Sequence, residues 1–130
     1  VLPNREINHL VLGRPALGTD INAHNEFLHQ EVKSNKLTRA HRLTTPIDPL
    51  SDIEQDIKLK GFQGLKVYRM YSITGDIANC VIEDFLPHEQ LELANDLGLW
   101  ITLHLSREDA CADKENLRDL EELQMLKIVN

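Results

Sequence analysis

The stretch LWITLHLSR, residues 99–107, is the best starting point for the fold, because it begins as an apolar, strand-like run and ends in polar residues. Up to Leu103 it has the composition of a strand buried in a parallel sheet. His104, Ser106 and Arg107 then bring polar groups to its carboxyl end. In α/β proteins, ligands gather where the parallel strands end, so this end is the first candidate for a functional site.

Strand-like and helical segments alternate along the rest of the chain. The predicted strands cover residues 7–12, 41–46, 64–71, 99–105 and 125–129, and the predicted helices cover residues 20–32, 49–61, 86–98 and 110–124. Spacings of roughly 25 to 35 residues between strand starts fit βαβ units. Strands joined in this way run parallel, with a right-handed crossover in about 98% of cases. The pattern predicts an α/β protein with a parallel sheet.

Local signals predict where the helices begin and end. Ser51, with Glu54 three residues later, is typical of a capping box and predicts the N-cap of the second helix. Pro87 fits the first turn of the third helix. Gly61 and Gly98 predict the ends of the second and third helices.

Two folds accommodate this pattern. One is a doubly wound open sheet of the flavodoxin type, and the other is about half of a (β/α)₈ barrel. The last predicted strand, MLKIV at 125–129, is followed by no helix, although a parallel sheet needs both faces buried. This favours the partial barrel, while an uncovered edge strand of an open sheet remains the alternative.

Composition sets further limits. The 130 residues are enough for one domain, and the net charge of −7 argues against a nucleic-acid surface. No apolar run approaches the length of a membrane span. Cys80 and Cys111 have no CxxC spacing and do not suggest a disulfide framework, so we expect a cytoplasmic protein. The chain opens on Val1, and we expect it to be part of a longer protein.

Two side chains are the main candidates for chemistry. His104 lies at a strand end, where a neutral imidazole is a common metal ligand or general base; the alternative is a hydrogen-bonded core histidine. Lys66 lies within an apolar strand, where an unpaired ammonium is costly, and a deprotonated amine would suit catalysis. The alternative for Lys66 is a side chain that reaches solvent or pairs with a carboxylate.

Three further polar residues follow the same strand ends. Arg69 and Arg107 could hold a substrate carboxylate or phosphate through a bidentate fork, and Tyr71 lies beside Arg69. The alternative is that both arginines are ordinary surface residues. Because side chains alternate along a strand, Lys66 and Tyr68 should share one face. By the same rule Thr102, His104 and Ser106 should share one face of the fourth strand.

The sequence also resembles a known enzyme family. The segments GFQGLKVYRMYS (61–72) and DFLPHEQLELANDLGLWITLHLSREDACADKENLRDLEEL (84–123) are similar to the amidohydrolase superfamily, particularly its amidohydrolase-related (amidohydrolase 2) branch. The segments INHLVLGRP (7–15), DINAHNEF (20–27) and TTPIDPLSDIEQDI (44–57) resemble earlier βα units of that family. The resemblance spans nearly the whole chain and places it at strands two to five, with the opening of strand six.

This resemblance implies a metal-dependent hydrolase on a TIM barrel. The divalent metal implied first is zinc. A water molecule activated by this metal would attack an amide, ester or lactone carbonyl. Alternatively, the metal would assist a decarboxylation. His104 aligns with the family's metal-binding histidine on strand five. Lys66 aligns with strand four, where some members carry a carboxylated lysine, and would be a second ligand or an electrostatic group.

The family's remaining metal-site residues have no counterpart in this sequence. Its HxH pair on strand one, its histidine on strand six and its aspartate on strand eight are absent. We therefore expect residues 1–130 to form one partial barrel domain of a longer enzyme, binding metal poorly and inactive on its own. Its open strand edges predict dimerisation or aggregation.

The predicted function is thus catalysis on a small-molecule substrate, with Lys66 catalytic, His104 a metal ligand, and Arg69, Tyr71 and Arg107 in substrate binding. The alternative from another class is a non-catalytic flavodoxin-like binding or receiver module. Such a module would need an acidic cluster at the strand ends, and Asp48 alone does not make one. A third alternative is a degenerate barrel that is not an enzyme and serves in protein assembly.

Overall fold

The structure is a computed structural model that describes residues 6–14 and 16–127. Within these residues it has strands β1 (His9–Leu12), β2 (Thr38–Thr44), β3 (Gly64–Val67) and β4 (Trp100–Thr102), and helices α1 (Ile21–Ser34), α2 (Leu50–Lys60), α3 (His88–Asp96) and α4 (Lys114–Lys127). Short 3-10 helices η1 (Arg69–Tyr71), η2 (Ile82–Asp84) and η3 (Ala110–Ala112) lie in the connections. The strict alternation of strand and helix confirms the predicted α/β class.

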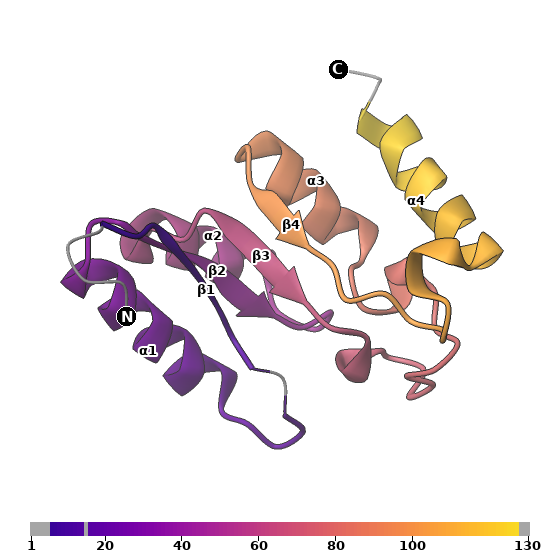
Figure 1. Ribbon diagram of the computed structural model, residues 1–130, viewed down its shortest axis with the longest axis horizontal. Helices are drawn as coiled ribbons and strands as arrows, with labels where there is room; N and C mark the ends of the chain where they lie inside the picture. The colour runs from indigo at the N-terminus through magenta and orange to yellow at the C-terminus, as the bar shows by residue number, and fades with distance from the viewer. Residues whose placement is uncertain (1–5, 15, 128–130) are drawn as a thin grey trace.

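The four strands form one parallel sheet. Their spatial order is β1-β2-β3-β4, so each strand pairs with the next strand in the chain. Figure 1 shows the strands crossing the sheet in chain order, from indigo β1 to orange β4. A doubly wound sheet instead reverses its strand order partway across.

The helices cover one face of this sheet. One apolar cluster packs Leu65 and Val67 of β3 against α2, α3 and α4, and a second packs Ala40 of β2 against Leu28 of α1. Ile57 of α2 contacts both clusters, which places them on the same side. We call this side the covered face and the opposite side the open face. The helix layer of a doubly wound sheet would occupy both sides.

Some predicted boundaries are wrong. Residues 125–127, predicted to start a fifth strand, continue α4, and residues 128–129 lie outside the described part. The run before them is rich in Leu, Glu, Arg and Gln, which are good helix formers, so the helix extends through the short apolar segment. The predicted strand over 64–71 ends at Val67 and continues as η1.

The helix ends are confirmed in part. Gly61 and Gly98 have φ of 73° and 64°, the left-handed conformation that favours glycine after a helix. Pro87 is the N-cap of α3. The predicted N-cap of α2 is wrong, because Pro49 holds that position without a side-chain hydrogen bond and Ser51 lies inside the helix. The fixed φ of proline already suits the start of a helix.

A side chain completes the sheet where β1 ends early. β1 pairs with β2 only as far as His41, which leaves the backbone of Leu43 without a strand partner on that side. The fully buried Asn25 of α1 takes this place: its Nδ2 donates to the carbonyl oxygen of Leu43 at 2.9 Å, and its Oδ1 accepts from the Leu43 amide at 2.8 Å. Asn25 therefore makes the two backbone hydrogen bonds that a neighbouring strand would make with Leu43, and these bonds link α1 to β2.

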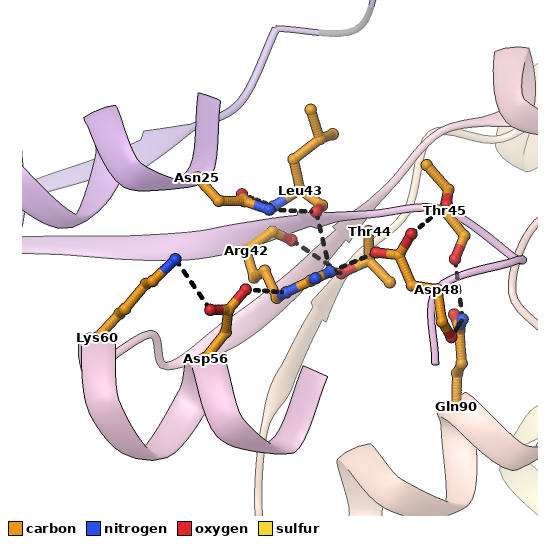
Figure 2. A network of polar contacts seen from close by, with 9 residues as sticks. All are labelled: Asn25, Arg42, Leu43, Thr44, Thr45, Asp48, Asp56, Lys60 and Gln90. Atoms are coloured by element: carbon orange, nitrogen blue, oxygen red, sulfur yellow. Dashed lines mark hydrogen bonds and ion pairs between the residues drawn. The ribbon is translucent and has the colours of Figure 1, made fainter. Parts of the chain in front are cut away.

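The covered face also holds a paired cation (Figure 2). Arg42 of β2 is 2% exposed and forms ion pairs with Asp48 at 2.5 Å and Asp56 at 2.8 Å. Asp56 also pairs with Lys60 of the same helix at 2.9 Å. Thr45 donates to Asp48, so the network fixes the connection from β2 to α2. Both charges of the two carboxylates are thereby matched by cations.

Candidate functional site

Lys66, the predicted catalytic residue, lies on the open face. The strand register places Leu43, Lys66 and Thr102 in one row across β2, β3 and β4. His41, Gly64 and Trp100 form the row nearer the amino ends of the strands. Because side chains alternate, both rows point away from the helices.

Lys66 is the buried cation of the open face. The residue is 5% exposed, and its Nζ donates to the carbonyl oxygen of Thr102 at 3.3 Å. The Nζ also lies 4.1 Å from the centroid of the Tyr68 ring, within the range of a cation–π contact. No ion pair within the described residues includes Lys66. Burial lowers the pKa of Lys66 from its usual value.

His104 follows β4 and stands next to the same tyrosine. The centroids of the Tyr68 and His104 rings are 5.4 Å apart, with an angle of 46° between the rings. The imidazole is exposed to solvent. Partial desolvation and then the positive charges of Lys66 and Arg69 lower the pKa of His104, which favours its neutral form. Lys66, Tyr68 and His104 therefore form one continuous cluster, in which Lys66 and Tyr68 lie together as the alternation rule predicted.

The sequence did not indicate that His41 belongs to this cluster. The predicted strand began at His41, which placed it at the amino-terminal edge, whereas β2 begins at Thr38 and brings His41 into the middle of the strand. Its Nδ1 hydrogen-bonds with Thr102 Oγ1 at 2.8 Å. Burial and then the charge of Lys66 lower the pKa of His41. The signal that could have identified it is Thr38, a β-branched residue that extends the strand.

Gly64 makes room for His41. A Cβ at position 64 would lie 2.3 Å from the carbonyl oxygen of Trp100 and 2.7 Å from His41 Nε2. The first contact is with the backbone of the neighbouring strand, so any larger residue would push β4 away. Glycine at this position is therefore required by the close approach of β4 and the imidazole.

Two tyrosines anchor the segment that follows β1. The Tyr68 hydroxyl donates to the carbonyl oxygen of Gly13 at 2.8 Å. The Tyr71 hydroxyl accepts from the Ala16 amide at 3.3 Å. Tyr71, predicted to bind substrate, thus contacts the chain itself, and its substrate role stays a prediction. Arg69 lies close enough for its charge to act on His104.

Arg107 lies apart from the cluster around Lys66. Its backbone has φ of 62°, which turns the chain after β4, and its guanidinium donates to the carbonyl oxygen of Asn79 at 3.1 Å and to Asp113 at 3.5 Å. Ser106 is buried, and its hydroxyl donates to the carbonyl oxygen of Cys80 at 2.5 Å. Both residues thus fasten the β4–α4 connection to residues 79–80. The substrate role of Arg107 stays a prediction.

His104 is a candidate metal ligand, but the described residues do not form a complete metal site. Within residues 6–14 and 16–127 no group of three His, Cys, Asp or Glu side chains could hold a metal ion. The neutral imidazole of His104 suits a divalent metal as a single ligand. The positive charges of Lys66 and Arg69 beside it oppose a cation unless the lysine loses its proton. The described residues on their own therefore do not complete a metal centre.

Three comparisons with known proteins, against family models, curated sequences and solved structures, find no match. Among the helices that the structure describes, none is both long and apolar enough to cross a membrane.

Proposed function

We propose that this chain supplies the active-site face of a (β/α)₈-barrel enzyme of the amidohydrolase type, which hydrolyses an amide, ester or lactone or carries out a related decarboxylation. The observation that carries the proposal is the convergence of Lys66, Tyr68 and His104 at the carboxyl ends of neighbouring parallel strands. In barrels this is the end at which active sites lie. The substrate would be a small molecule.

The arrangement of the sheet supports a barrel. Sequential strand order with all helices on one face is the arrangement of a (β/α)₈ barrel, whose helices form an outer ring. The open face would then correspond to the barrel interior. A doubly wound module would place helices on both faces, so the binding or receiver alternative has less support.

The chain's own residues have distinct proposed roles. His104 would be a zinc ligand of this face, and further ligands would come from outside the described residues. Lys66 is the catalytic group, held beside the Tyr68 ring. Arg69 adds positive charge to the same site and would attract an anionic group of the substrate.

A zinc titration followed by NMR tests the metal ligand even if binding is weak. The imidazole signals of the six histidines are recorded as Zn²⁺ is added, and His104→Ala assigns the signal of interest. We expect His104 to shift at the lowest zinc concentration. His88→Ala is the control, because His88 lies on α3, away from the cluster around Lys66, and is a half-buried histidine beside Glu92. Equal zinc dependence of all six signals would contradict the assignment of His104.

A further inference from the structure

A pocket lies on the open face, near the amino ends of the strands. Its volume is about 460 Å³, which is the size of cavities that hold small ligands. We call it the amino-end pocket. Lys66 and His104 are not among the residues that line it, so it is separate from the site of the proposed hydrolase. The lining residues that matter for its chemistry are Leu10, Arg39, His41 and Trp100.

Gly64 leaves space open beside this pocket. In the sheet register it lies between His41 and Trp100, whose side chains both point to the open face. A Cβ at position 64 would lie 2.7 Å from His41 Nε2. Any other residue here would therefore fill the space next to the imidazole.

His41 brings a buried ring nitrogen to the pocket. The residue is 6% exposed, and the described hydrogen bonds of its imidazole use Nδ1 alone, which contacts Thr102 Oγ1 at 2.8 Å. When the Thr102 hydroxyl donates to Nδ1, the neutral ring carries its proton on Nε2. Nε2 then has a donor with no partner among the described residues. A ligand atom that accepts a hydrogen bond would satisfy this donor.

Arg39 supplies a cation that is already held in place. Its Nη1 donates to the carbonyl oxygens of Lys36 at 2.8 Å and Thr38 at 3.1 Å. Within the described part of the chain, its Nε and Nη2 make no hydrogen bond and no carboxylate pairs with it. These remaining donors can bind an anion without reorienting the guanidinium.

The other walls of the pocket are apolar. Trp100 is 74% exposed and Leu10 is 54% exposed, so both side chains can take up further apolar contact. The flat face of an indole favours stacking with another aromatic ring. The pocket therefore combines an aromatic surface with donors that suit a negative charge.

We propose that the amino-end pocket binds a small planar aromatic anion. Its ring stacks on Trp100, and its charged group accepts hydrogen bonds from Arg39 and from His41 Nε2. Charge complementarity selects the anion, because no described aspartate or glutamate lines the pocket, although the chain carries a net charge of −7. This second ligand site goes beyond the proposed hydrolase and needs neither a metal nor a closed barrel.

The single tryptophan of the chain reports binding directly. Naphthoate and the neutral naphthylmethanol are added separately to the intact chain, and the indole N–H signal of Trp100 is followed by NMR. We expect naphthoate to bind about tenfold more tightly, because the neutral alcohol cannot accept charge-assisted hydrogen bonds. Equal dissociation constants for the two compounds would overturn the preference for an anion.

Two variants locate the site. Arg39→Gln should weaken naphthoate binding about tenfold and leave naphthylmethanol binding unchanged. Arg118→Gln is the matched control, because Arg118 is an exposed arginine of α4 that pairs with Glu115. The same naphthoate affinity in Arg39→Gln and in the unchanged protein would overturn the position of the site. An indole signal that shifts with protein concentration alone would show that a second copy covers the pocket, and would overturn the ligand.

The outcome is separable from that of the hydrolase proposal, because the two titrations report on different residues. Naphthoate should shift the Trp100 signal whether or not zinc shifts His104 first. A naphthoate shift without any selective zinc shift would overturn the metal-ligand role alone. A selective zinc shift with no response of Trp100 to naphthoate would overturn the amino-end site alone.

Discussion

Two buried cations occupy opposite faces of the same sheet, and their surroundings differ. Arg42, on the covered face, is 2% exposed and has two carboxylates within 2.8 Å. Lys66, on the open face, is 5% exposed and lies against a carbonyl oxygen and an aromatic ring. A paired buried charge is a structural element, whereas an unpaired one is kept for a reason other than stability. The difference supports our proposal that the open face is the functional one.

Removing Arg42 should have the largest effect on stability. Arg42→Met leaves Asp48 without its cation and Asp56 with Lys60 alone, and breaking a buried pair in this way costs about 3–5 kcal/mol. Urea unfolding measures the loss. Lys58→Met is the control, because its ion pair with Glu54 is exposed and should be worth less than about 1 kcal/mol. Equal losses in the two variants would show that the Arg42 network does not stabilise the covered face.

Filling the space beside His41 should have the next largest effect. Gly64→Ala places a methyl group against the backbone of Trp100, and overpacking of this kind costs about 1–3 kcal/mol. The same substitution should also move His41 and break its hydrogen bond with Thr102. Urea unfolding gives the first effect, and the imidazole NMR signal of His41 gives the second. An unchanged His41 signal would mean that β4 moves and the imidazole does not.

Removing the unpaired cation should cost little or nothing. Lys66→Met keeps the aliphatic length of the side chain and removes an amine that has no carboxylate partner within the described residues. We expect a change within about 1 kcal/mol in either direction, since replacing a buried charge by an apolar group is often neutral or stabilising. Urea unfolding beside Arg42→Met measures the contrast. A loss as large as that of Arg42→Met would mean that Lys66 is structural.

The smallest effect is the pH dependence that His41 gives to stability. Its pKa in the folded protein is lowered from 6.5, so between the lowered value and 6.5 the unfolded chain binds more protons. Stability therefore falls as the pH drops below about 6.5. His41→Gln should flatten the change in unfolding free energy between about pH 7.5 and 5. The same slope in both proteins would assign the effect to other groups, of which His104 is the first.

The fold could be predicted from the sequence where the periodic signals are strong. The alternation of strands and helices, the glycines after α2 and α3 and the common face of Lys66 and Tyr68 all follow from local periodicity. The prediction of a fifth strand at residues 125–129 is wrong for residues 125–127, because periodicity cannot distinguish a short apolar run from the end of a helix.

The candidate site was predicted only in its centre. Lys66 and His104 were identified because a lysine inside an apolar run and a histidine at its end contrast with their neighbours. His41 was missed because the start of β2 was placed three residues too late. The position of Arg107 depends on a backbone turn with φ of 62° and on partners at residues 79 and 113, which the strand pattern does not contain.

The most direct test is the pKa of the Lys66 amine, measured by NMR on ¹⁵N-labelled lysine with Lys66→Met to assign the signal. We predict that Lys66 titrates below the usual lysine value of 10.5. A Lys66 pKa at that usual value would mean that the ammonium is solvated or paired. The open face would then have lost the feature that distinguishes it from the covered face.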